Sequence, residues 1–264
     1  MPRFAANLTW MFNEHAFTDR FQAAADAGFE AVEIQLPYDH PPETLARRRE
    51  AAGVKQIMFN APPGDMKAGE YGIAGLPGRE AEFRASMDQA LEYARALDCR
   101  LVHVLAGIVP DGVAEARCWA TYLENIAWAA DHCVNAGVGL LLEPINTVER
   151  PGYLVSLTTR AREAVDRLKR DNVGIQYDFH NAQLMEGRLT RTLEANIEKI
   201  RHMQVAGLPD RTPPDEGEMN FPYLFALVDR LGYEGWIGCE YRPRGGTLES
   251  LGWASPYGID RGRS

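Results

Sequence analysis

Short apolar segments alternate along this chain with longer segments of helical periodicity. The most distinct apolar segment runs from Gly139 to Glu143 as Gly-Leu-Leu-Leu-Glu, and Pro144 follows it. An apolar run of this length between glycine and proline predicts a buried strand, because proline has no N–H to donate to a central ladder. The segment ends in a carboxylate, and a buried charge there needs a cation, a hydrogen-bonding partner or water.

The same pattern recurs and predicts eight strands, each except the last followed by a segment with the period of an amphipathic helix. We expect strands at residues 4–7, 31–35, 56–60, 100–105, 139–143, 173–178, 200–206 and 236–241, and helices at residues 16–27, 41–52, 79–97, 114–136, 158–169, 189–199 and 220–231. Alternation of apolar strands with helices predicts a parallel sheet covered by helices, an α/β fold.

The number of units favours a closed barrel over an open sheet. Eight units in 264 residues suit a (β/α)8 TIM barrel, and no G-x-G-x-x-G motif follows the first strand to support a Rossmann fold. We therefore expect a single TIM-barrel domain over residues 1–264. Residues from about 245 to 264 form a Gly-rich and Arg-rich C-terminal tail, which we expect to wrap the outside or meet another subunit.

The composition narrows the classes of partner and compartment. A net charge of −9 and a pI near 5.2 argue against general affinity for nucleic acid or acidic membranes. The chain contains no run of about 18 apolar residues, so we expect no transmembrane helix. The polar N-terminus lacks the pattern of a signal peptide. The cysteines form no Cys-x-x-Cys pair, so we expect reduced, mostly buried thiols in a cytoplasmic protein: Cys99, Cys118, Cys133 and Cys239.

Polar side chains follow the last four predicted strands. In a TIM barrel ligands bind at the carboxyl ends of the strands, and strands five to eight deliver Glu143, Asp178, Gln204 and Glu240 there. Since adjacent strands lie about 4.8 Å apart, these side chains can converge. A lone acid at a strand end is more often a helix N-cap or an ion-pair partner, but four oxygen donors on successive strands favour a metal site. The oxygen-only set suits Mg²⁺ or Mn²⁺ rather than Zn²⁺.

These four residues and the segments around them resemble the hydroxypyruvate isomerase family within the xylose isomerase-like barrel superfamily. The resemblance covers nearly the whole chain and is carried by Phe4–Leu8, Gly72–Glu80, Tyr93–Leu97, Leu142–Asn146, Ile175–Asp178, Met185–Gly187, Gly217–Asn220 and Ile237–Tyr241. It implies a divalent cation on Glu143, Asp178, Gln204 and Glu240, with Glu143 and Glu240 as the acid/base pair. The implied reaction interconverts hydroxypyruvate and tartronate semialdehyde (2-hydroxy-3-oxopropanoate), a step of glyoxylate metabolism.

The chemistry agrees with those roles. An aldose–ketose type shift moves a proton between adjacent carbons through an enediolate, and needs a Lewis acid on the oxygens plus carboxylates facing the carbon. Glu143 and Glu240 come from strands well separated around the ring, so they can flank a substrate. One removes the proton, and the other returns it or shuttles the hydroxyl proton.

Four further residues are candidates for binding a small hydroxy-oxo acid. Superfamily relatives place a substrate-contacting His three positions after the metal Asp; here Asn181 has that position and His180 comes one residue earlier, so either can make the contact. Glu149 follows Glu143 by six residues, as a substrate-contacting acid does in related sugar epimerases. The planar fork of Arg211, in the loop after strand seven, suits a substrate carboxylate. The alternative for these side chains is an exposed loop position.

Other functions remain possible on the same residues. Isomerisation of a 2-oxo-tetronate is a close rival, and a ketose 3-epimerase is a more distant one. Abasic-site DNA repair is disfavoured, because it needs a His-rich three-metal site and a basic groove, whereas this chain has six His and a charge of −9. A non-catalytic metal-binding or sugar-binding protein would not need two flanking acids. The chain length of the substrate, the metal and homo-oligomer formation are left open.

Overall fold

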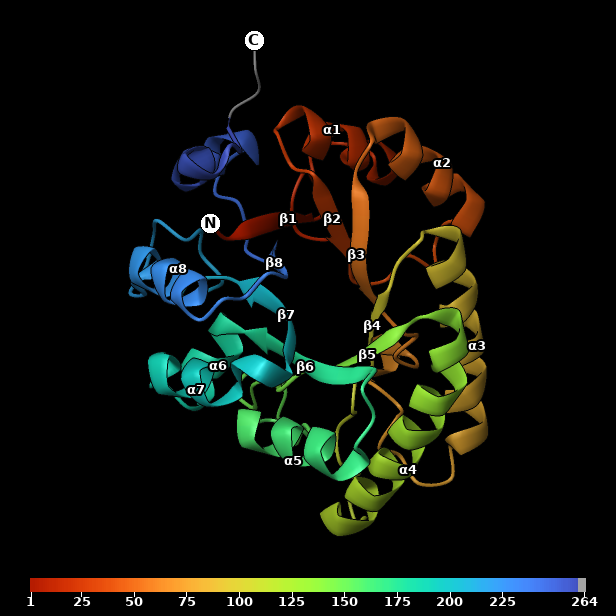
Figure 1. The fold of residues 1–264 in the computed structure, drawn as a ribbon. Coiled ribbons are helices and arrows are strands. Elements are labelled where there is room, and N and C mark those ends of the chain that lie inside the picture. The colour runs from red at the N-terminus through yellow and green to blue at the C-terminus, as the bar shows by residue number, and fades with distance from the viewer. Residues whose placement is uncertain (261–264) are drawn as a thin grey trace.

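Eight parallel strands form a closed barrel in the computed structural model, which describes residues 1–260 (Figure 1). Each strand pairs with the next in sequence, and β1 pairs with β8 to close the ring. The strands are β1 Arg3–Asn7, β2 Ala31–Ile34, β3 Lys55–Asn60, β4 Leu101–His103, β5 Gly139–Leu142, β6 Val173–Asp178, β7 Ile200–Val205 and β8 Trp236–Cys239. The predicted (β/α)8 TIM barrel is confirmed.

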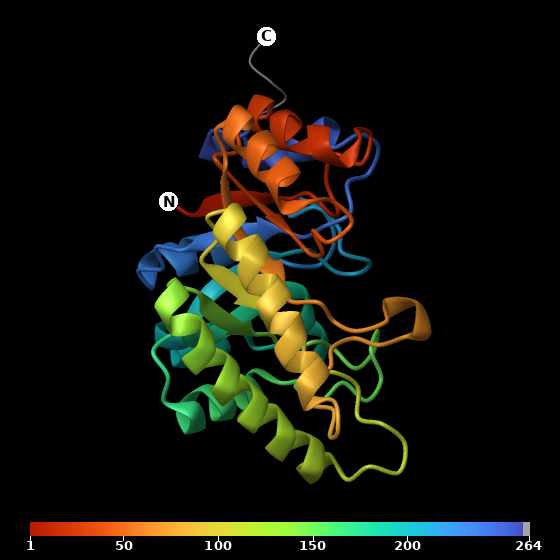
Figure 2. The ribbon, with the colours of Figure 1, turned by 90° about the vertical axis from the view of Figure 1, so that its right-hand side faces the viewer.

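Helices surround this barrel on the outside, and α3 and α4 lie side by side along one flank (Figure 2). The α-helices are α1 Arg20–Asp26, α2 Pro42–Ala52, α3 Glu80–Ala96, α4 Glu115–Cys133, α5 Thr158–Leu168, α6 Phe179–Met185, α7 Leu189–Asn196 and α8 Phe221–Arg230. Short 3-10 helices are η1 Phe17–Asp19, η2 Met66–Ala68, η3 Val134–Ala136 and η4 Ile197–Lys199, and a longer one, η5, spans Leu248–Tyr257. No helix in the described residues has the length and apolarity needed to cross a bilayer.

The expected element boundaries differ from the observed ones mainly at the strand ends. The strand expected at 100–105 ends at His103, although Val104 and Leu105 are buried. The strand expected at 236–241 likewise ends at Cys239. The apolar pattern reports burial, and burial continues past the last residue of the strand, so the pattern predicted strands that are too long.

Helix α6 was not predicted. It has only seven residues and begins directly after Asp178, whose side-chain Oδ1 caps it by accepting a hydrogen bond of 2.9 Å from His180 N. The N-cap role that was weighed against metal binding for a strand-end acid is thus real at this position. It uses one carboxylate oxygen of Asp178 and leaves the other for the site.

The C-terminal tail packs on the outside of the barrel. Trp253 and Tyr257 of η5 meet Phe4 of β1 edge-on, with ring centroids 4.9 Å apart in both pairs, and Trp253 also packs against Phe225 of α8. Asp260 N donates to Ala27 O. The tail therefore covers the flank of β1 and β8, where the eighth helix of the alternation is missing. Residues 261–264 of the expected tail lie outside the described residues.

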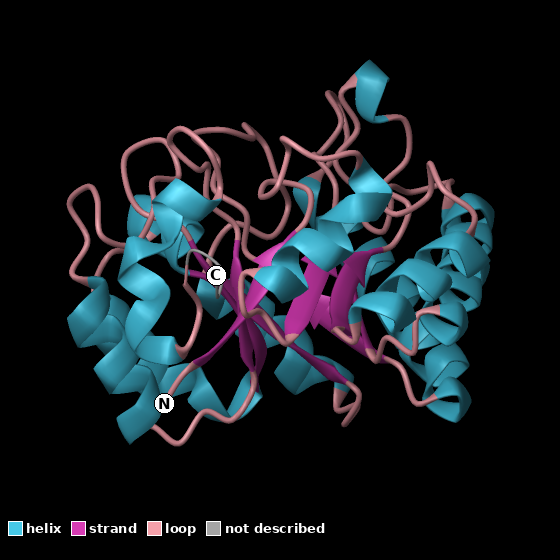
Figure 3. Cartoon of the chain, turned by 90° about the horizontal axis from the view of Figure 1, so that it is seen from above, coloured by secondary structure: helices cyan, strands magenta, loops and turns pink. Residues whose placement is uncertain are grey.

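The inside of the barrel changes from apolar to polar along its axis. Ala5, Ala31 and Ile57 form a small buried cluster. Two residues further along their strands, Asn7 and Glu33 point to the same side, since side chains alternate along a strand, and both are fully buried. The long loops gather on one side of the barrel (Figure 3). Asn7 and Glu33 belong to a polar layer inside the barrel, which lies between the apolar cluster and these loops.

All four cysteines are buried and free, as predicted for Cys99, Cys118, Cys133 and Cys239.

Gly238 of β8 gives a test of how tightly the polar layer is packed. A Cβ at this position would lie 2.1 Å from Glu33 Oε2, and the fully buried Glu33 carboxylate is held by its own hydrogen bonds. We expect Gly238→Ala to lower the free energy of unfolding by about 1–3 kcal/mol, measured by chemical denaturation. Gly246→Ala is the matched control, because nothing lies within 4 Å of a Cβ there. Equal stability of the two variants would contradict the tight packing.

Candidate active site

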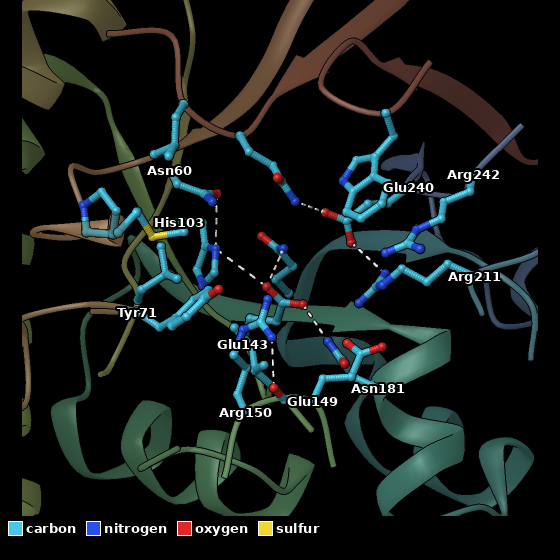
Figure 4. A pocket seen from close by; sticks show the side chains of 18 residues that line it. Asn60, Tyr71, His103, Glu143, Glu149, Arg150, Asn181, Arg211, Glu240 and Arg242 are labelled. Atoms are coloured by element: carbon cyan, nitrogen blue, oxygen red, sulfur yellow. Dashed lines mark hydrogen bonds and ion pairs between the residues drawn. The ribbon is translucent and has the colours of Figure 1, made fainter. Parts of the chain in front are cut away.

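A cavity of about 450 Å³ opens at the carboxyl ends of the strands (Figure 4). Polar side chains from most of the strands and the loops that follow them reach its wall: Gln35, Asn60, His103, Glu143, Glu149, Gln176, Asn181, Arg211 and Glu240. Glu143 and Glu240, the two residues predicted to act as acid and base, both line this cavity.

Glu143 directly follows β5 and is held by amide donors. Its Oε1 accepts a hydrogen bond of 2.9 Å from Asn181 Nδ2, and its Oε2 accepts one of 2.9 Å from Gln176 Nε2. Burial, followed by the charges of Glu240 and Asp178, raises the pKa of Glu143 well above its ordinary value. A carboxyl group with a raised pKa is suited to exchange a proton near neutral pH.

His103 lies beside this carboxylate, with Nδ1 at 3.5 Å from Glu143 Oε2 and 3.1 Å from Asn60 Oδ1. Burial, and then the nearby His202, lower the pKa of His103 to about 3. The imidazole is therefore neutral at physiological pH and does not neutralise Glu143.

Glu240 directly follows β8 and binds one amide and one cation. Gln35 Nε2 donates a hydrogen bond to its Oε1, and Arg211 Nη1 donates one of 2.9 Å to its Oε2. Burial raises the pKa of Glu240 to about 8, although the positive charge of Arg211 opposes the shift. Glu240 can thus also hold or release a proton near neutral pH.

Arg211 bridges two of the predicted metal ligands. Its Nη1 contacts Glu240, and its Nη2 lies 3.0 Å from Asp178 Oδ2, an oxygen that makes no hydrogen bond. Arg211 is buried, so its charge is hardly screened by water. One guanidinium thus serves two carboxylates, and Glu143 has no such partner.

Gln204 of β7 is oriented by the polar layer inside the barrel. Its Oε1 accepts a hydrogen bond of 2.6 Å from Gln176 Nε2, and its Nε2 donates one of 2.8 Å to Glu33 Oε1. Glu33 also accepts from Asn7 Nδ2 at 2.8 Å, and its Oε2 lies 2.7 Å from His202 Nε2. Because its Nε2 is bound to Glu33, the amide oxygen of Gln204 faces Gln176, which also binds Glu143.

The donor chemistry of Glu143, Asp178, Gln204 and Glu240 fits a hard divalent cation. Arg211 pairs with two of the three carboxylates, Asp178 Oδ2 makes no hydrogen bond within residues 1–260, and burial, followed by the charges of Glu240 and Asp178, raises the pKa of Glu143. Within residues 1–260, no three His, Cys, Asp or Glu side chains are arranged together as a metal site. Arg211 instead makes the contacts with Asp178 and Glu240 that a shared cation would make.

The structure separates the two alternatives predicted for the substrate contact after Asp178. Asn181 lines the cavity and also donates to Glu143. His180 is buried behind it, with Nδ1 at 3.1 Å from Gly207 O and Nε2 at 3.4 Å from Glu149 Oε1. Glu149 lines the cavity, and its contact with the His180 ring lowers its pKa to about 2. His180 therefore acts on the cavity through Glu149, while Asn181 reaches it directly.

Gln176 is a site residue that the sequence reasoning missed. It lies two residues before Asp178 on β6 and donates to both Glu143 and Gln204. The signal for it was available, because residues two apart on a strand point to the same side. From the sequence, Asp178 is the expected oxygen donor of this strand, and the inward amide two residues before it is not among the candidates.

Comparison with known proteins assigns the chain to a family. Residues 21–257 match the family model described as xylose isomerase-like TIM barrel, and the chain belongs to this family. A 2-oxo-tetronate isomerase of Cupriavidus necator is 51% identical over 257 residues, which cover 97% of this chain and 99% of that protein. Hydroxypyruvate isomerase of Escherichia coli is 41% identical, covering 97% of this chain and 100% of that protein. The chain is an isomerase of this group, as the resemblance of its motifs indicated.

Solved structures agree on the fold. A crystal structure from Brucella melitensis, described as an AP endonuclease of family 2, has a TM-score of 0.95 and 48% identity, and covers 97% of this chain and 99% of that one. A structure of L-ribulose 3-epimerase has a TM-score of 0.76 at 19% identity, covering 97% of this chain and 86% of that one, which shows a common fold alone.

Glu33 provides a test of the polar layer beneath the site. It is fully buried and accepts from Asn7, Gln204 and His202. In Glu33→Gln the new amide N–H₂ faces these donors, so we expect the free energy of unfolding to fall by about 2–4 kcal/mol in urea denaturation. Glu30→Gln, at an exposed position just before β2, is the control and is expected to change it by less than about 0.5 kcal/mol. Matching denaturation curves for the two variants would show that the donors do not depend on the carboxylate.

Proposed function

We propose that this isomerase moves the carbonyl group of a small 2-oxo-3-hydroxy acid from C2 to C3, and that its substrate is a 2-oxo-tetronate. The observation that carries this proposal is that Glu143 and Glu240, which follow β5 and β8, line one cavity. Two carboxyl groups that exchange protons near neutral pH suit a reaction that takes a proton from one carbon and returns it to the next.

Hydroxypyruvate is the second candidate substrate, because the two reactions are the same at C2 and C3. A tetronate differs from hydroxypyruvate by one additional hydroxymethyl group on C3. The relatives named 2-oxo-tetronate isomerase are 51%, 44% and 43% identical to this chain, whereas hydroxypyruvate isomerase of Escherichia coli is 41% identical. The higher identity supports the four-carbon acid.

The proposed reaction consists of three proton transfers, two at carbon and one between the oxygens. One carboxylate removes the proton from C3, and the electron pair forms the C2–C3 double bond of an enediolate. The C3 hydroxyl proton passes to the oxygen on C2, and the return of a proton to C2 gives the 2-hydroxy-3-oxo acid. Glu143 and Glu240 share these transfers, while the amides of Asn181, Gln176 and Gln35 hold the two carboxyl groups in place.

A divalent cation, Mg²⁺ or Mn²⁺, is part of the proposal. Glu143, Asp178, Gln204 and Glu240 would hold it, since they offer the oxygen donors that such ions prefer. When bound, it supplies Lewis-acid stabilisation of the negative charge that develops on the substrate oxygens. Asn181, Glu149 and Arg211 contact the substrate in this proposal, and His180 positions Glu149. The free, buried cysteines support a cytoplasmic location.

The cavity wall supports an acid substrate over an uncharged ketose. Arg150, Arg211 and Arg242 all line it, and a 3-epimerase substrate has no carboxylate for them. DNA repair, suggested by the description of the Brucella melitensis protein, is not proposed for this chain. The net charge of −9 and the buried carboxylates of the site oppose binding of a polyanion.

The substrate assignment predicts an order of catalytic efficiencies. We expect kcat/KM to be highest for a 2-oxo-tetronate and roughly 10-fold lower for hydroxypyruvate, because one carbon unit in a fitted pocket contributes about that factor. The assay follows each acid and a ketohexose with added Mg²⁺ or Mn²⁺. Removal of metal by a chelator should abolish turnover, and added metal should restore it. Epimerisation of the ketohexose without turnover of either acid would overturn the proposal.

The acid/base assignment predicts the behaviour of two isosteric variants. Glu143→Gln and Glu240→Gln are each expected to lower kcat by roughly 10²- to 10⁴-fold, because an amide cannot exchange the proton. Glu218→Gln, an exposed glutamate in the loop before α8, serves as the control and should keep wild-type turnover. Metal content is measured for every variant. Near-wild-type kcat in both site variants, with metal bound, would contradict the assignment.

A further inference from the structure

An acid substrate needs a cation for its carboxylate, and three arginines line the cavity. Arg150, Arg211 and Arg242 come from the loops after β5, β7 and β8 (Figure 4). Their side chains differ in how many of their N–H donors are already used. This difference decides which of them is free to bind an incoming carboxylate.

Arg211 is already bound by two carboxylates of the protein. Glu240 Oε2 lies 2.9 Å and Asp178 Oδ2 lies 3.0 Å from its guanidinium nitrogens. Both contacts engage terminal guanidinium nitrogens, so a bidentate substrate carboxylate would have to displace a carboxylate of the protein. Arg211 is therefore better suited to balance the carboxyl groups of the protein than to bind that of a substrate.

Arg150 is partly used. Its guanidinium lies over the ring of Tyr71, with 4.0 Å between its carbon and the ring centroid, and its Nη1 donates a hydrogen bond of 2.8 Å to Glu149 O. The carboxylate of Glu149, next to it in the chain, also lines the cavity and would repel an anion placed beside it.

Arg242 keeps all its side-chain donors. Within residues 1–260 its guanidinium makes no hydrogen bond and no ion pair. It lies 5.2 Å from the ring centroid of Trp10, and its backbone N donates 2.8 Å to Arg211 O, which holds this part of the chain in place. Trp10 also lines the cavity, and its buried Nε1 has no hydrogen-bond partner. The unused donors of the Arg242 guanidinium suit the several acceptor sites of a carboxylate.

We propose that Arg242, supported by the ring of Trp10, binds the carboxylate of the substrate and sets the specificity of this isomerase for acids. The proposal rests on the proposed function and deepens it. Arg242 and Glu240 line the same cavity, so an acid bound by Arg242 can extend toward Glu240. Arg211 then keeps Asp178 and Glu240 in position and does not carry the selection for an anion.

The test measures binding apart from turnover. Erythronate is a four-carbon hydroxy acid without a keto group, so it cannot isomerise. Its Kd for the Mg²⁺-loaded full-length protein is measured by calorimetry. Uncharged erythritol is measured in the same way. We expect Arg242→Gln to weaken erythronate binding by roughly 10- to 100-fold and to leave erythritol binding unchanged. Arg242→Lys keeps the charge and should recover part of the affinity. For the 2-oxo acid, KM should rise in Arg242→Gln while kcat changes little.

Arg244→Gln is the matched control, because Arg244 is exposed and paired with Glu216 at 2.9 Å. It should bind erythronate as the wild type does. Thermal melts check that every variant is folded, which is expected at position 242 because Arg242 is exposed. Arg150→Gln tests the competing arginine.

The outcomes separate this proposal from the proposed function. Unchanged erythronate affinity in Arg242→Gln, or a loss confined to Arg150→Gln, overturns the assignment of Arg242 even if the wild type isomerises a 2-oxo acid. Loss of affinity in Arg242→Gln supports the assignment even if the wild type turns over no 2-oxo acid, a result that overturns only the reaction. Failure of the wild type to bind erythronate also counts against the carboxylate site.

Discussion

The burial of several carboxylates at the barrel mouth is the constraint on which the rest of the site depends. Glu143, Asp178 and Glu240 are buried together, and Arg211 contacts only the last two. Buried carboxylates without a cation are costly unless they accept hydrogen bonds. Amide side chains donate hydrogen bonds to Glu143 and Glu240, while burial raises the pKa values of both carboxyl groups. A site balanced by several lysines or arginines would have fully ionised acids, which are weaker bases.

A further buried carboxylate inside the barrel is also held by polar side chains. Glu33 lies beneath the site, and three polar side chains from neighbouring strands bind its two oxygens. One of them is Gln204, so the orientation of an amide at the site depends on a carboxylate in the interior. Gly238 leaves the space that this carboxylate occupies. Side chains on strands and joined in this way have little freedom to move, and a catalytic group is most useful when its position is fixed.

The arrangement of the fold could be predicted from the sequence because it follows from periodicity. Apolar strands alternating with helices give a parallel barrel, and a polar residue at each strand end then falls at the same face. The convergence of Glu143, Asp178 and Glu240 required no further information. Helix α6 was missed because seven residues are too few for a helical period to be recognised beside a strand.

The hydrogen-bond partners could not be predicted, because they depend on register. The pairing of β2 with β3 shifts between Val32 and Ile34, and that of β6 with β7 shifts between Ile175 and Gln176. Glu33 lies within the first shift and Gln176 at the second. A one-residue shift changes which side chains of two strands lie opposite each other. No residue type in these segments marks the shifts, so the sequence indicates the acceptors of the site without showing which donors reach them.

The distribution of charge across the cavity bears on the choice between an acid and a sugar. The acid and base candidates Glu143 and Glu240 lie on the wall of the cavity together with Arg211. Arg150 and Arg242 provide cations on the wall that are not paired with protein carboxylates in residues 1–260. A small oxo acid has an anionic end and a carbon that must lose a proton. In one orientation its carboxylate can contact an arginine while this carbon faces the carboxyl groups. A ketose is neutral at both ends and could form hydrogen bonds but no ion pair with these arginines, which therefore favour an acid over a sugar as the substrate.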